Sequence, residues 1–128
     1  LGDIFRALGR FEESIQVYQQ AIAVEPESAE ICNIMGMAFK DNGQTKEAIQ
    51  AYQKAIQIDP HYVEAYNNLG NLFKSDGRFA EALQAFQQAL ELNPSIAEVH
   101  NNLGTVLKVM GKIEEAIGVY KTAIEINQ

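Results

Sequence analysis

The chain is poor in several informative residue types. Its 128 residues include one cysteine, three prolines and no tryptophan, and 10 Lys and Arg are set against 17 Asp and Glu. The single cysteine, Cys32, cannot form an internal disulfide, so nothing indicates an oxidising compartment and we expect a cytoplasmic location. The formal net charge of −7 is opposite in sign to that of most proteins that bind nucleic acid phosphates. We therefore predict no nucleic acid partner.

Long apolar runs are also missing. The longest, such as Ala21 to Val24, span about four residues, whereas a helix that crosses a bilayer needs roughly 20. We therefore expect no membrane segment. The chain starts at Leu1 without a basic and apolar leader, although a leader could have been removed from a longer protein. Apolar residues still make up 47% of the chain, which is typical of one packed domain.

A period of 34 residues organises the chain. Eight of the nine glycines fall into two columns with this spacing. The columns are Gly2, Gly36, Gly70, Gly104 and Gly9, Gly43, Gly77, Gly111, and the rings Tyr18, Tyr52, Phe86, Tyr120 repeat in the same way. Such a period is typical of helical arrays. We predict one array over residues 1–128, with repeats 1–28 (lacking the start of its first helix), 29–62, 63–96 and 97–128.

Each repeat has the pattern of two helices. Apolar residues recur three and four positions apart on both sides of an Asn-Gly or Asp-Gly pair, as in Asp76-Gly77. The glycine of that pair is predicted to take the left-handed backbone of a turn. The second helix runs into a closing Asn-Pro or Asp-Pro pair, where Asp59 and Asn93 are expected to cap the following helix. Ser95 and Glu98 have the spacing of a capping box.

These motifs resemble the tetratricopeptide repeat. The residues that carry the resemblance in the third repeat are Tyr66, Leu69-Gly70, Phe73, Ala82, Phe86 and Pro94. The match extends over essentially the whole chain. Departures are the first aromatic column, which holds Cys32, Tyr66 and His100, and single changes at Ser14 and Leu107. The resemblance implies an all-α fold, a right-handed superhelical solenoid of antiparallel helix pairs, whose first helices line a concave face.

No group of residues has the pattern of a catalytic, metal or cofactor site. The only histidines are His61 and His100, and a zinc site needs more His and Cys ligands than the chain offers locally. The glycines belong to turns and close helix contacts, and no Gly-Lys-Ser or Gly-Lys-Thr loop is present to hold a phosphate. We predict that the chain is not an enzyme and that it binds no metal and no cofactor.

Asparagines form a row on the first helices of the repeats. They are Asn33, Asn67, Asn101, their neighbours Asn68 and Asn102, and Asn71 one turn further on. Asparagine is a mediocre helix former, so we expect another role to offset its cost. A carboxamide donates and accepts, and so it can pair with the backbone of an extended peptide. The resemblance places this row in the concave groove, and the tetratricopeptide arrays of protein O-linked N-acetylglucosamine transferases carry a similar asparagine ladder. The alternative is that the row serves packing or solubility.

Charges are sorted along the same helices. Glu30, Glu64 and Glu98 begin the helices, and Lys40, Lys74 and Lys108 lie ten residues later, about 15 Å along a helix. We predict that the lysines form a basic rim of the peptide-binding groove, although helices in general favour acids early and bases late. Family members that clamp acidic chaperone tails have basic residues where this chain has Asn and Glu, so that specificity is not expected.

The sequence predicts a module that binds an extended peptide or protein segment. Two alternatives are the substrate-binding part of a larger glycosyltransferase and a self-assembling scaffold. The last repeat stops after Tyr120, Ala123 and Ile124 without a polar capping element, so end-to-end association of copies is also expected.

Overall fold

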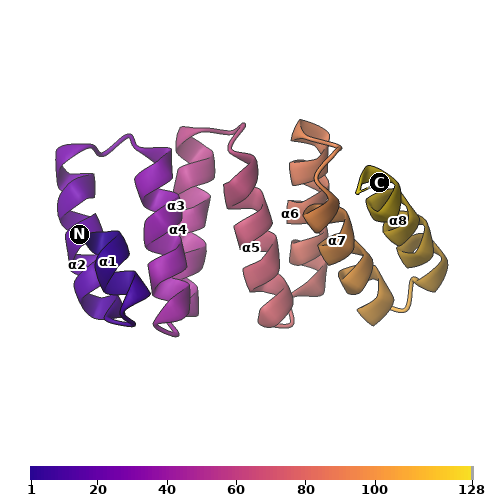
Figure 1. The fold of residues 1–128 in the computed structure, drawn as a ribbon, viewed down its shortest axis with the longest axis horizontal. Helices are drawn as coiled ribbons and strands as arrows, with labels where there is room; N and C mark the ends of the chain where they lie inside the picture. The colour runs from indigo at the N-terminus through magenta and orange to yellow at the C-terminus, as the bar shows by residue number, and fades with distance from the viewer. Residues whose placement is uncertain (128) are drawn as a thin grey trace. The chain divides into compact units, whose positions relative to one another are not determined.

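The computed structural model describes residues 1–127, which form eight helices and no strand (Figure 1). Their bounds are α1 (Gly2–Ala7), α2 (Phe11–Val24), α3 (Ala29–Asp41), α4 (Thr45–Ile58), α5 (Val63–Ser75), α6 (Phe79–Leu92), α7 (Ala97–Val109) and α8 (Ile113–Ile126). The prediction of an all-α fold of paired helices is confirmed. Two compact units divide the chain within α5, one ending at Ala65 and the other beginning at Tyr66.

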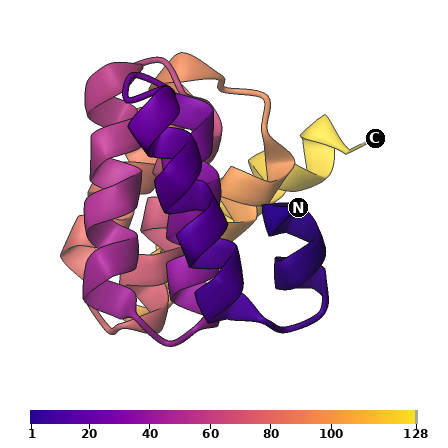
Figure 2. The ribbon, with the colours of Figure 1, turned by 90° about the vertical axis from the view of Figure 1, so that its left-hand side faces the viewer.

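The first unit contains two helix hairpins. The short α1 packs against α2, to which a tight turn joins it (Figure 2), and α3 packs against both α2 and α4. Cys32, Ala55 and Ala65 form a fully buried cluster, which Ile22 and Tyr62 partly cover. Small buried residues let the helix backbones approach closely, and the larger side chains fill the space beside them.

The second unit contains the rest of α5 and helices α6 to α8. Helix α7 packs against α6 and α8. Its buried residues Val99, Leu103, Val106 and Leu107 follow the three- and four-residue spacing of an amphipathic helix. The interior side of α7 was therefore predictable from its sequence.

Tight turns join the two helices of each hairpin. Gly77 has φ of +77°, and the next residue, Arg78, donates its backbone N–H to the Phe73 carbonyl oxygen over 2.8 Å. This geometry closes the C-terminus of α5 with a left-handed residue that glycine adopts without strain. Gly43 has φ of +79° in the equivalent turn, so the predicted role of these glycines is confirmed.

The starts of the helices differ in part from the prediction. The Asp59 and Asn93 side chains accept hydrogen bonds from the backbone N–H groups of His61 and Ser95, at 3.0 and 3.1 Å. They therefore stabilise the connecting turns instead of capping the helices that follow. The predicted capping box is wrong, because α7 begins after Ile96 without a side-chain cap.

Candidate functional site

Two asparagines join the first helices of the second unit. The Asn102 Nδ2 of α7 donates to the Asn67 Oδ1 of α5 over 3.2 Å, and both residues are partly exposed. A carboxamide has two N–H donors and an oxygen with two lone pairs, so one bond uses only part of the capacity of each group. The pair fixes the orientation of both amides and keeps a donor and an acceptor for a ligand.

The other asparagines of this unit also lie at its surface. Asn101 on α7 is exposed, and Asn68 and Asn71 on α5 are partly exposed. Asn67 and Asn71 are four residues apart, so they lie on one stripe of α5. The second unit thus presents several amides from two helices.

Asn33 has a different environment in the first unit. Only 2% of it is exposed, and its side chain hydrogen-bonds the Tyr62 hydroxyl. Burial is the main cause of the raised pKa of Tyr62 and the charge of Glu64 adds to it, whereas the bond from Asn33 opposes the shift. This burial favours a structural role for Asn33, because a ligand at the surface cannot reach its amide.

The three lysines of the predicted rim lie at the surface. Lys40 and Lys108 are exposed and Lys74 is half-buried. The ion pairs within residues 1–127 use the arginines, among them Arg6, whose Nε lies 2.9 Å from the Asp41 Oδ2. Arg6 precedes the lysines in the same column, but its charge is already paired.

Groups suited to catalysis are scattered. Cys32 is buried, and burial is the main cause of its raised pKa. His61 is exposed on a turn, while the His100 Nε2 donates to the Pro94 carbonyl oxygen over 2.9 Å. Residues 1–127 contain no group of three His, Cys, Asp or Glu side chains placed to hold a metal ion. Within the same residues, no helix is both long and apolar enough to cross a bilayer.

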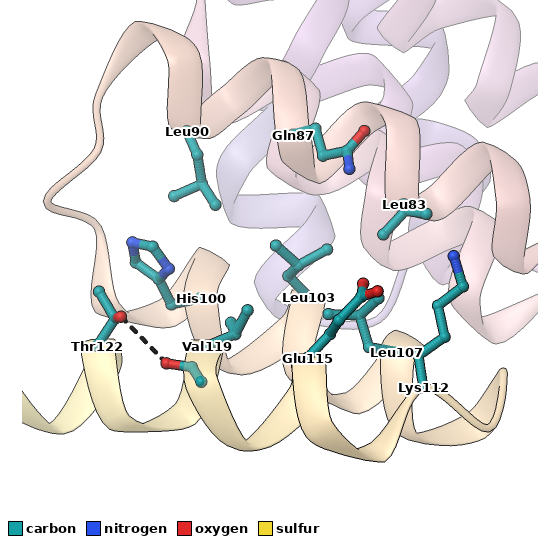
Figure 3. A pocket seen from close by; sticks show the side chains of 11 residues that line it. Leu83, Gln87, Leu90, His100, Leu103, Leu107, Lys112, Glu115, Val119 and Thr122 are labelled. Atoms are coloured by element: carbon teal, nitrogen blue, oxygen red, sulfur yellow. Dashed lines mark hydrogen bonds between the residues drawn. The ribbon is translucent and has the colours of Figure 1, made fainter.

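The structure also contains a groove that was not predicted. It lies between α6 and α8 over α7 and has a volume of about 450 Å³ (Figure 3). Gly118 and Thr122 form part of its α8 wall. In the earlier repeats, both columns hold glutamine or lysine, as at Gln50 and Lys54. This change from long to small side chains in the last repeat was the sequence feature from which the groove could have been predicted.

Paired antiparallel helices with a glycine turn in each hairpin define a helical-repeat protein. One family model, described as TPR repeat, matches residues 2–43 and 36–77, and another, described as tetratricopeptide repeat, matches residues 63–96 and 97–128. The chain therefore belongs to the tetratricopeptide repeat family. No curated protein sequence matches it.

Several solved structures of MamA are similar to the chain. One crystal structure of MamA is 30% identical, has a TM-score of 0.90, and the match covers 98% of this chain and 74% of that one. A second is 26% identical with a TM-score of 0.90, covering 98% and 69%. A third, of MamA MSR-1, is 25% identical with a TM-score of 0.84, covering 99% and 73%. With the repeats, these matches establish the chain as a protein-interaction module.

Proposed function

We propose that the chain binds an extended segment of a protein partner along the asparagine-bearing sides of its first helices. The observation that carries this proposal is the hydrogen bond between Asn67 and Asn102, which orients two partly exposed amides on neighbouring helices. Amides held in this way can pair with successive peptide groups of a ligand without reading its side chains. The predicted concave groove and the resemblance to the asparagine ladder of O-linked N-acetylglucosamine transferases support the same ligand.

The proposed contact residues are those asparagines and lysines of the predicted groove whose side chains are at least partly exposed. In the second unit they are Asn67, Asn68, Asn71, Asn101 and Asn102, with Lys74 and Lys108. Lys40 of the first unit stays a prediction. Asn33 is left out because it is buried. Amides and ammonium groups bind and orient a ligand but supply no nucleophile or general base near neutral pH, so we propose binding without a catalytic step. The cytoplasmic location stays a prediction.

Replacing Asn71 and Asn101 with alanine tests the proposal. The probe is a set of peptides selected on the native chain from a random display library, with affinity measured by fluorescence anisotropy. We expect the double variant to bind at least about tenfold more weakly, a change of about 1.4 kcal/mol. Its melting temperature should stay the same or rise, because alanine is the better helix former.

The matched control replaces Gln84 and Gln88, which are exposed on α6, with alanine. This control should keep the affinity for the same peptides. Equal affinity of the Asn71 and Asn101 variant would contradict the proposal, and a much lower melting temperature would show that these asparagines are structural.

A second candidate function is self-assembly through α8. Ile117 and Ile124 are 49% and 63% exposed, whereas Ile15, which occupies the position of Ile117 in the first repeat, is 6% exposed. Ile15 belongs to α2, which α3 covers. We propose that a repeat surface of another copy covers the same face of α8. Sedimentation velocity should then detect concentration-dependent association that Ile117→Lys abolishes, while an unchanged monomer at millimolar concentration would exclude it.

A further inference from the structure

The groove between α6 and α8 is distinct from the asparagine-bearing face. Its floor is formed by α7 through His100, Leu103 and Leu107 (Figure 3). At 100° per residue, Leu103 and Leu107 lie about 120–160° around α7 from Asn101. Asn101 and Lys108 lie within about 20° of each other on the other side. A ligand in the groove would therefore not cover Asn101 and Lys108, which belong to the proposed peptide-binding face.

The walls of the groove carry apolar side chains on both sides. Leu83 and Leu90 of α6 and Val119 of α8 line it and are partly exposed. The groove volume of about 450 Å³ is within the range of about 300–1,000 Å³ for binding pockets. Partly exposed aliphatic side chains on both sides of a hollow favour an apolar guest, because covering them removes their surface from water.

Two positions of α8 keep this groove open. The three residues in the column of Gly118 are Gln16, Gln50 and Gln84, and those in the column of Thr122 are Gln20, Lys54 and Gln88. Only the last repeat replaces these long side chains with small ones. A glycine inside a helix costs about 1 kcal/mol relative to alanine. Gly118 therefore lowers the stability of α8 and leaves open space beside Val119.

Carboxylates lie in the groove and next to it. Glu115 lines the groove, Glu91 follows Leu90 beside an adjoining hollow, and Glu125 lies one turn beyond Thr122. The basic residues among the lining residues are Lys112 and His100. An apolar guest that carries basic groups on its flanks would complement both the walls and the edges.

We propose that this groove binds the apolar face of a basic amphipathic helix of a protein partner. From His100 to Leu107 the floor extends over seven residues, about 10 Å or two helical turns. Leucines at positions i, i+3 or i+4, and i+7 of a partner helix extend over the same length, which is the spacing of helix-in-groove recognition. Gln87 also lines the groove, but Leu83, Leu90 and Val119 offer no regular row of hydrogen-bonding groups to an extended strand, so the apolar face of a helix fits these walls better.

A synthetic helical peptide with leucines on one face and lysines elsewhere is the probe. We expect it to bind the native chain with an affinity that falls as salt rises, since its lysines pair with exposed carboxylates. Gly118→Gln combined with Thr122→Gln restores the side chains of the earlier repeats. This double variant should bind at least about tenfold more weakly in calorimetry and melt no lower, because glutamine is a better helix former than glycine.

Three comparisons make the experiment decisive. The control variant Gln84→Ala with Gln88→Ala changes exposed residues of α6 outside the groove and should keep the affinity. A peptide of the same composition without a leucine face should bind weakly, and so should one with glutamates in place of lysines. Equal binding of the scrambled or acidic peptide, or equal affinity of the Gly118 and Thr122 variant, would overturn the proposal.

Discussion

The same substitution, glycine to alanine, should have opposite effects at two helical positions of the second unit. A Cβ at Gly70 would lie 2.5 Å from the Phe86 Cε1 and 2.7 Å from its Cδ1, whereas a Cβ at Gly118 would meet no atom within 4 Å. Neither glycine has a positive φ, so the backbone accepts alanine at both. Phe86 is fully buried, so its ring is enclosed by other parts of the protein.

The expected magnitudes follow from two terms. Alanine is favoured over glycine inside a helix by about 1 kcal/mol, which applies to both positions. Optimal carbon contacts are about 3.5–4.0 Å, so the Phe86 ring must shift by about 1 Å, and overpacking of this kind costs about 1–3 kcal/mol. Gly118→Ala should therefore raise the free energy of unfolding by about 1 kcal/mol, and Gly70→Ala should lower it by up to about 2 kcal/mol.

Urea unfolding followed by circular dichroism at 222 nm measures both variants. The helix term cancels in their difference, which leaves the packing cost alone. In the Phe86→Leu background, Gly70→Ala should cost less stability than it does in the native chain. The effect of Gly118→Ala should be the same in both backgrounds. If Gly70→Ala were as stable as Gly118→Ala, the contact between glycine and ring would not limit the residue at position 70.

Two further predictions concern tyrosines. The Tyr52 hydroxyl is buried and has no hydrogen-bond partner within residues 1–127, whereas the Tyr120 hydroxyl lies 3.0 Å from the Thr105 Oγ1. Tyr52→Phe should thus keep or raise stability, and Tyr120→Phe should lower it by about 0.5–1.5 kcal/mol in urea unfolding; the reverse order would contradict the argument. Burial and then the hydrogen bond to Asp3 raise the pKa of Tyr18 to about 12, and burial also raises the pKa of Tyr52. Because the folded state holds these two protons more tightly than the unfolded state does, the part of the stability that depends on Tyr18 and Tyr52 should be constant below about pH 10 and fall between about pH 10 and 12. Denaturant unfolding at a series of pH values measures this fall, while absorbance at 295 nm follows the ionisation of the tyrosines. An equal fall in stability for the variant with both Tyr18→Phe and Tyr52→Phe would argue against this prediction.

Much of the fold was predictable from the sequence because helical periods and turn chemistry are local. The spacing of Leu69, Leu72 and Phe73 predicts the buried stripe of α5, and all three are buried. Asp76-Gly77 predicts the turn, and Gly77 has the positive φ that the turn requires. The 34-residue recurrence of the first glycine column with the rings also agrees with the close contact of Gly70 and Phe86.

Only the tertiary structure decided which asparagines are exposed. Asn33 and Asn67 occupy the same column, yet Asn33 is buried against Tyr62 while Asn67 is partly exposed and pairs with Asn102. The repeat pattern gives the side of a helix on which a residue lies, but not which side chain of a neighbouring element reaches it. The groove over α7 depends in the same way on side chains from three helices. A helical period determines direction around one axis, whereas exposure and pairing depend on distances between axes, which packing alone sets.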